Sequence, residues 1–121
     1  MKSNNVVVDK SYAFALKSIQ LYQFLKNQKE FDLGRQILKS GTSIGANVEE
    51  AIGAHSERDF VAKLGIAYKE SREAHYWVRL LYDASIITVD QAQPLLEQSE
   101  ELLRIIGSIQ KKMKQKTTRN S

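Results

Sequence analysis

The chain has 121 residues, 42% of them hydrophobic, which suits one domain with a single modest core. It contains no cysteine, which excludes disulfides and thiolate chemistry and argues against a structural zinc site. No apolar run approaches the roughly 18 to 20 residues that a membrane span needs, and Val6–Val8 are too few for a signal-peptide core. We therefore expect a cytoplasmic protein.

The net charge of +4 is unevenly distributed along the chain. The segment after Gln110, KKMKQKTTRNS, carries five basic residues and no acid, whereas the rest carries 13 basic and 14 acidic residues. Such asymmetry occurs in nucleic-acid-binding proteins, and it also occurs where a solvated surface is self-complementary.

Residues 1–10 lack helical periodicity and are expected to form a loose N-terminal arm. A first helix is predicted from Ser11, a candidate N-cap, to Gln28. Its apolar residues at i, i+3 and i+4 spacing are Tyr12, Ala15, Ile19, Tyr22 and Leu25. Three further residues make the apolar stripe wider than one core-facing helix requires: Phe14, Leu21 and Phe24.

A second helix is predicted from Asp32 to Ala54, with Phe31 positioned to pack as a hydrophobic staple at its start. This helix is rich in small residues and has glycines at positions 41, 45 and 53. Each glycine inside a helix costs about 1 kcal/mol relative to alanine. We interpret these positions as points where another helix or a ligand approaches closely.

The third helix is predicted from Glu57 to Ala84, after a sequence that resembles a capping box, Ser56 to Asp59. Its heptad seam is Phe60, Leu64, Ala67, Ser71, Ala74, Val78 and Leu81. A fourth helix should begin between Thr88 and Gln93, with Pro94 in its first turn because proline cannot donate an interior hydrogen bond. Its seam is Leu95, Ser99, Leu102, Ile106, Ile109 and Met113. Residues 114–121 are expected to form a basic, disordered tail.

Four amphipathic helices joined by short loops predict an all-α fold over residues 1–121, an up-down-up-down antiparallel four-helix bundle. Several helices carry apolar residues outside their seams. Small bundles with such a surplus usually bury it by self-association, so we expect a homo-oligomer.

The sequence gives little support to a catalytic, metal or cofactor site, and we predict none. Helical di-iron proteins place a glutamate three residues before histidine, whereas Arg72 precedes His75 and Ile52 precedes His55 at that distance. Ser43 lies on an apolar helix face, as Ser71 does, and we expect such hydroxyls to bond back to the preceding turn.

The basic segment is the best candidate for a binding function. In an antiparallel bundle the end of the fourth helix lies near the start of the first, which predicts one basic pole. The lysines predicted to contact phosphates there are Lys10, Lys17, Lys111, Lys112, Lys114 and Lys116. The alternative is that these lysines complement the helix dipole and aid solubility.

The segment from Ser40 to Leu81 closely resembles a family of four-helix-bundle proteins. That family was first noted as open reading frames within intervening sequences of bacterial large-subunit ribosomal RNA genes. The matching residues are Arg35, Ser43-Ile44-x-Ala46-Asn47, Glu50, Phe60, Lys63, Lys69-Glu70 and Tyr76-Trp77. This chain has Gly45 where many members have proline, and Glu50-Ala51 where many have Glu-Gly.

The resemblance implies a left-handed antiparallel bundle that assembles into a homopentameric ring and has no established enzymatic activity. A related branch, the accessory protein of diversity-generating retroelements, forms a similar basic ring that binds nucleic acid and a reverse transcriptase. We therefore expect a non-enzymatic homopentamer that binds RNA or another nucleic acid.

The alternative is a protein-interaction or scaffold module that binds no nucleic acid and uses the small-residue helix or the Trp77 face. Structural or interface roles are predicted for the motif residues Arg35, Ser43, Asn47, Glu50, Glu70, Tyr76 and Trp77. We expect Arg35, Asn47 and Glu50 to hydrogen-bond or pair across helices or subunits.

Overall fold

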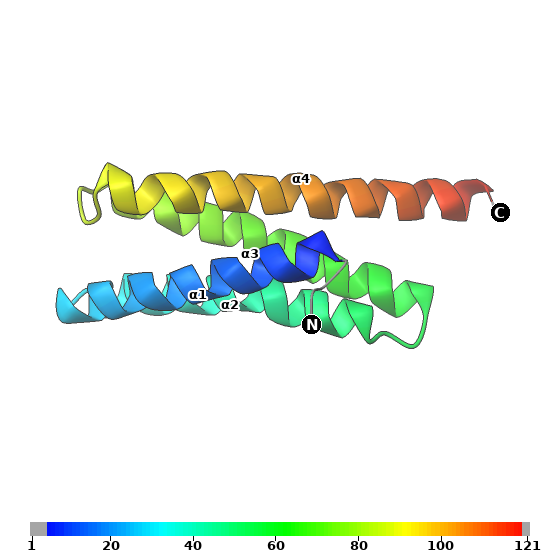
Figure 1. Ribbon diagram of the computed structural model, residues 1–121, viewed down its shortest axis with the longest axis horizontal. Coiled ribbons are helices and arrows are strands. Elements are labelled where there is room, and N and C mark those ends of the chain that lie inside the picture. Colours follow the sequence, from blue (N-terminus) through cyan, green and yellow to red (C-terminus); the bar gives the residue numbers. More distant parts are fainter. Residues whose placement is uncertain (1–4, 120–121) are drawn as a thin grey trace.

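The computed structural model describes residues 5–119, with side chains as far as Lys116. It contains four helices, α1 (Val6–Asn27), α2 (Phe31–Ile52), α3 (Glu57–Asp83) and α4 (Val89–Arg119) (Figure 1). Each helix packs against the next one in the chain, and α4 returns to lie beside α1. This is the predicted up-down-up-down four-helix bundle. Within residues 5–119, no helix is long and apolar enough to cross a lipid bilayer.

The loops α1–α2 and α3–α4 reverse the chain in the same way. Each contains one residue in the left-handed region, Lys29 with φ 64° and Ser85 with φ 62°. After each of them, a backbone N–H donates to a carbonyl five residues earlier, from Glu30 to Leu25 and from Ile86 to Leu81, both at 2.9 Å. These bonds close a Schellman motif that ends the helix sharply, so the next helix runs back along it.

Side-chain caps define the starts of α3 and α4. The Ser56 hydroxyl accepts a hydrogen bond from the Asp59 N–H at 3.0 Å, as the sequence predicted. At α4, Thr88 and Gln91 form a reciprocal capping box, in which the Thr88 N–H donates to Gln91 Oε1 at 2.8 Å. Because Thr88 caps the helix, α4 begins at Val89 and Pro94 lies in its second turn. The prediction that Pro94 lies in the first turn is wrong.

The predicted N-terminal arm is also wrong for residues 6–10, because α1 begins at Val6. Asn5 is the N-cap, and residues 1–4 lie outside the described part of the chain. Ser11 is buried inside the helix, where its hydroxyl donates to the Val8 carbonyl at 3.2 Å. The sequence predicts a cap at Ser11 because it does not show that a small side chain is needed on this face of the helix.

The core-facing stripe of α1 differs from the predicted one. Its buried residues are Val7, Ser11, Phe14, Ser18, Leu21 and Leu25. Tyr12 and Ile19, which the spacing assigned to the apolar stripe, are exposed. Two serines make the buried stripe less apolar than the outer one, which explains the wrong assignment.

The predicted disordered tail is helical as far as Arg119, and residues 120 and 121 lie outside the described part. Ile109 packs against the core and Met113 is half-buried, so the apolar seam extends to the last turns of α4. The predicted seams are otherwise confirmed, with Leu64 to Leu81 buried in α3 and Leu95 to Ile106 buried in α4.

The small residues of α2 lie where α1 approaches. A Cβ atom added at Gly41 would lie 2.5 Å from Ser18 Cβ and closer still to Ser18 Oγ. At Gly45 it would lie 3.3 Å from the Ser11 carbonyl oxygen. The prediction of close helix approach is confirmed at Gly41 and Gly45, and the approaching element is α1. It is wrong for Gly53, which is the C-cap of α2 and where an added Cβ would meet carbonyl oxygens of α2 itself.

Candidate nucleic-acid interface and helix seams

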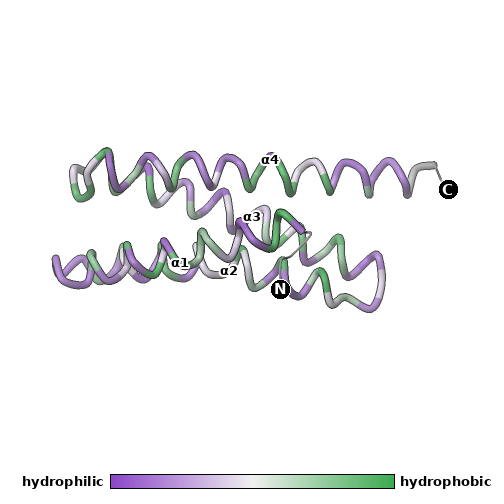
Figure 2. Tube along the Cα trace, in the orientation of Figure 1, coloured by the Kyte–Doolittle hydropathy of each residue, from purple (hydrophilic) through white to green (hydrophobic). Residues whose placement is uncertain are grey.

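The basic end of α4 is an exposed stretch of helix, which we define as Lys111, Lys112, Lys114 and Lys116. All four side chains are exposed, and the hydrophilic character of this end is visible in Figure 2. The spacing places Lys112 one turn from Lys116 and Lys111 one turn from Lys114, on two rows that lie about 150° apart around the helix. The Lys116 ammonium pairs with the carboxylate of Glu57 at the start of α3. Figure 1 shows this end of α4 at the same end of the bundle as the α2–α3 loop.

Lys10 and Lys17 do not join the basic end. Lys10 lies beside Glu101, with its Nζ 2.9 Å from a carboxylate oxygen. Lys17 lies near the start of α4, beside Asp90 and Pro94. The distance along α4 from Pro94 to Lys111 is about 25 Å at 1.5 Å per residue. A single pole that includes Lys17 is therefore wrong, because α1 runs past the acidic first half of α4.

Two of the motif residues lie at the seam between α2 and α3, Glu50 beside Lys63 and Glu70 near Lys39. Glu50 pairs with Lys63 of α3 at 3.2 Å, which confirms a pair across helices. Asn47 instead donates to the Ser43 carbonyl of its own helix at 2.8 Å. Ser43 likewise donates to the Lys39 carbonyl at 2.6 Å, as predicted for a hydroxyl inside a helix.

Arg35 also bonds within its own helix, to Asp32 at 2.5 Å. Of the three residues expected to pair across helices, Glu50 does so within this chain. The other two have their partners inside α2.

The α3 side of this seam carries carboxylates and aromatic rings. Partial burial, followed by the neighbouring charge of Glu73, raises the pKa of Glu70 above its ordinary value, and Lys69 and Lys39 act in the opposite direction. The Trp77 indole N–H donates to Glu73 at 3.4 Å. The Tyr76 ring meets the Trp77 ring edge-on at a centroid distance of 5.2 Å. Trp77 packs against the core, whereas Tyr76 is exposed.

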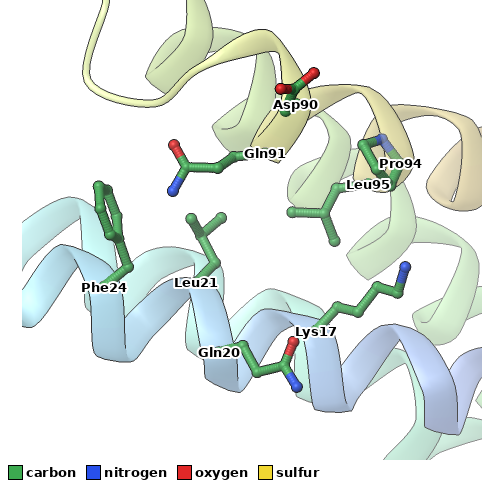
Figure 3. A pocket seen from close by; sticks show the side chains of 8 residues that line it. All are labelled: Lys17, Gln20, Leu21, Phe24, Asp90, Gln91, Pro94 and Leu95. Carbon is green, nitrogen blue, oxygen red and sulfur yellow. The ribbon is translucent and has the colours of Figure 1, made fainter.

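Helices α1 and α4 contact each other less extensively than the other neighbouring pairs of helices do. The larger hollow between them has a volume of about 240 Å³ and is lined from both helices by Lys17, Gln20, Leu21, Phe24, Asp90, Gln91, Pro94 and Leu95 (Figure 3). A smaller hollow of about 120 Å³ lies further along, between Lys10, Ala13, Gln98 and Glu101. Among the described residues, the Gln98 side-chain oxygen is buried and has no hydrogen-bond donor. A buried hydrogen-bond acceptor without a donor lowers the free energy of unfolding by about 1–3 kcal/mol.

The two histidines do not build a metal site. His75 lies 3.1 Å from a carboxylate oxygen of Glu100, which joins α3 to α4. Among the described residues, no group of three histidine, aspartate or glutamate side chains is placed to hold a metal ion.

Comparison with known proteins identifies the family. A family model described as "23S rRNA-intervening sequence protein" matches residues 3–108, most of the chain. The chain belongs to the 23S rRNA-intervening sequence protein family. It is also similar to a crystal structure from Bacteroides thetaiotaomicron, described as a protein of unknown function from the S23 ribosomal protein family. The sequences are 48% identical, the match covers 88% of this chain and 99% of the other, and the TM-score is 0.86. No curated protein matches the chain.

The basic end of α4 lies beyond residues 3–108, the part of this intervening sequence protein that the family model matches. The candidate nucleic-acid interface is therefore a feature of this chain outside the matched region. Sequence reasoning missed Glu57 and Glu101, which pair with Lys116 and Lys10. Both partners are distant in sequence, and the register between helices is needed to find them. It also missed the unpaired oxygen of Gln98.

Proposed function

We propose that this protein is a non-enzymatic homo-oligomer of the cytoplasm, a pentamer, that binds RNA through the basic end of α4. The observation that carries the proposal is the continuity of α4 through Arg119, with its lysines exposed. A lysine on a rigid helix loses less conformational freedom on binding than one on a disordered tail. Each phosphate that a lysine neutralises releases counterions, which favours binding at low salt.

Self-assembly would strengthen this interaction. Exposed apolar side chains on α1 and α3 support association between copies. In a closed ring whose axis runs along the bundle, every copy presents its basic end on the same side. A long RNA could then contact several basic ends at once, and avidity would exceed the affinity of one subunit.

The test is RNA binding to full-length protein across a salt series, measured by fluorescence anisotropy. In the variant Lys111→Gln/Lys112→Gln, we expect weaker binding and a salt slope reduced by roughly 1.5, because each lost phosphate contact removes about 0.7–0.9. The matched control is Lys26→Gln/Lys29→Gln, which removes the same charge at the α1–α2 loop. Equal losses in the two variants would indicate a response to net charge alone. Absence of salt-dependent binding by the wild type would refute the proposal.

A second candidate function is a protein-interaction module that uses the outer face of α3. Tyr76 and Leu80 are exposed there, and a Cβ added at Gly65 would meet no atom within 4 Å. The discriminating measurement is co-purification after nuclease treatment. One protein retained by the wild type and lost with Tyr76→Ala would favour this function, whereas loss of all bound material on nuclease treatment would favour RNA.

A further inference from the structure

The outer side of α3 carries a row of cations around one aromatic ring, which we call the α3 stripe. Its members are all exposed: Arg58, Lys69, Arg72, Tyr76 and Arg79. At about 100° per residue they fall within an arc of about 80°, and the centre of this arc lies about 150° from the buried seam of α3. The folded subunit therefore presents these side chains to water, away from its own core.

The charges of α3 are sorted around the helix. Although α3 has as many acids as bases, only Asp83 falls on the arc of the stripe, and it lies one turn beyond Arg79. The other acids lie toward α2 or toward α4: Glu57, Asp59, Glu70 and Glu73. Glu73, which borders the stripe, is half-buried and accepts the Trp77 indole N–H at 3.4 Å. The stripe is therefore cationic along its whole length.

The cations of the stripe have no acidic partners. Among the described residues they make no ion pair, whereas Lys10, Lys63 and Lys116 each face a carboxylate. Lys69 and Arg72 lie one turn apart, and like charges at this spacing destabilise a helix. An anion that neutralises both would relieve the repulsion. The stripe is therefore suited to a polyanion that runs along the helix.

The Tyr76 ring is held in place although it is 46% exposed. The guanidinium carbon of Arg79 lies 5.8 Å from the centroid of the ring. The Trp77 ring, which packs against the core, meets it edge-on at a centroid distance of 5.2 Å. A side chain that is already ordered loses little conformational freedom when a ligand binds. Tyr76 is therefore a preorganised platform on which a flat, unpaired base can stack.

The stripe begins where the basic end of α4 meets α3. Lys116 pairs with Glu57, the residue before Arg58. Figure 1 shows this end of α4 beside the start of α3. From Arg58 the stripe extends about 32 Å to Arg79, at 1.5 Å per residue. The two cationic surfaces adjoin, so one strand of nucleic acid can contact both.

We propose that the α3 stripe binds single-stranded RNA, with its cations on the phosphates and an unpaired base stacked on Tyr76. This inference rests on the proposed RNA binding and extends its site from the basic end of α4 onto α3. Proteins that bind single strands combine a cationic track with aromatic rings, as this face does, and a duplex offers no unstacked base to the ring. Burial against a protein or a second copy is less favourable, because unpaired cations would be removed from water.

The first test compares Tyr76→Ala with Tyr82→Ala by fluorescence anisotropy. Tyr82 is the matched control because it lies on the same helix and is 42% exposed, but outside the arc of the stripe. With an oligouridylate of about 12 nucleotides, Tyr76→Ala should weaken binding by about 5-fold or more without changing the salt slope. Affinity for an RNA duplex of equal length should not change. Tyr76→Phe, which keeps the ring, should bind like the wild type.

The second test removes two cations of the stripe. In Lys69→Gln/Arg72→Gln we expect weaker binding and a salt slope reduced by about 1.4, because each phosphate contact to a single strand contributes about 0.7. The control Lys26→Gln/Lys29→Gln removes the same charge at the α1–α2 loop and should keep the wild-type slope. Circular dichroism checks that every variant folds.

Photocrosslinking gives a direct readout, because iodouridine-substituted RNA should attach to the peptide that contains Tyr76. Wild-type binding by both Tyr76→Ala and Lys69→Gln/Arg72→Gln would overturn the inference and leave the basic end of α4 as the RNA site. Equal losses in Tyr76→Ala and Tyr82→Ala, or crosslinks only outside α3, would also overturn it. A protein that is retained after nuclease treatment and lost with Lys69→Gln/Arg72→Gln would make the stripe a protein-binding surface instead. A wild type that binds no RNA would refute this inference and the proposed function together.

Discussion

The two seams of α1 differ in how closely the helices approach. Against α2, glycines face serines, so that no Cβ fits between Gly41 and Ser18. Both seams have hollows at the surface, about 400 Å³ in the α1–α2 seam and about 240 and 120 Å³ in the α1–α4 seam. The α1–α4 contact is less extensive and includes a surface ion pair between Lys10 and Glu101. Small residues let two helices meet backbone to backbone, whereas long polar side chains hold them apart. Close packing of small residues holds α1 against α2, whereas longer side chains reach across the seam between α1 and α4.

The largest effect is expected from adding volume to the tightly packed seam between α1 and α2. In Gly41→Ala the new Cβ would overlap Ser18, and α1 and α2 would have to separate. Overpacking costs about 1–3 kcal/mol or more, against a gain in helix propensity of about 1 kcal/mol. We expect a net loss of about 2 kcal/mol in the free energy of unfolding, measured by urea denaturation at one protein concentration. Adding Ser18→Gly should restore part of it.

Gly65→Ala is the matched control, because it is the same substitution inside a helix with open space around the new methyl group. It should stabilise the protein by up to about 1 kcal/mol. If Gly41→Ala were also stabilising, the α1–α2 seam would not be tight, and the contrast between the two seams would disappear.

The contrast also explains which parts of the fold could be predicted. In the buried seams of α3 and α4, apolar residues outnumber a single serine, Ser71 or Ser99, so apolar periodicity located both seams correctly. In α1 the buried stripe contains Ser11 and Ser18, and the exposed stripe contains Tyr12 and Ile19. Hydrophobicity therefore favoured the wrong face. A serine is buried here because it faces a glycine at a close contact between two helices. Such a contact can be recognised only when both helices are placed together.

The basic end of α4 was predicted only in part, because part of that prediction also depended on how two helices are placed together. Lysines at positions 111–116 are adjacent in the sequence, so their clustering required only a helix. The grouping with Lys17 required the register between α1 and α4, which Glu101 and Pro94 determine. Self-association was expected because α1 had more apolar residues than one face could bury. The identity of the surplus residues emerged only from the structure.

The second prediction concerns the seam between α1 and α4. Gln98→Met keeps the length of the side chain and removes the buried oxygen that lacks a donor. This substitution should raise the free energy of unfolding by about 1 kcal/mol. Gln93→Met, an exposed position on the same helix, should change stability by less than about 0.5 kcal/mol.

The smallest effect is expected for the ion pair that spans the seam between α1 and α4. Lys10 and Glu101 are 42% and 40% exposed, so solvent screens their attraction. A double-mutant cycle with Lys10→Gln and Glu101→Gln should give a coupling energy of a few tenths of a kcal/mol, falling further in about 1 M salt. The Glu50–Lys63 pair across α2 and α3, at 3.2 Å, provides the reference cycle and should give a similar value. A coupling well above 1 kcal/mol for Lys10–Glu101 alone would mean that this pair holds α1 against α4.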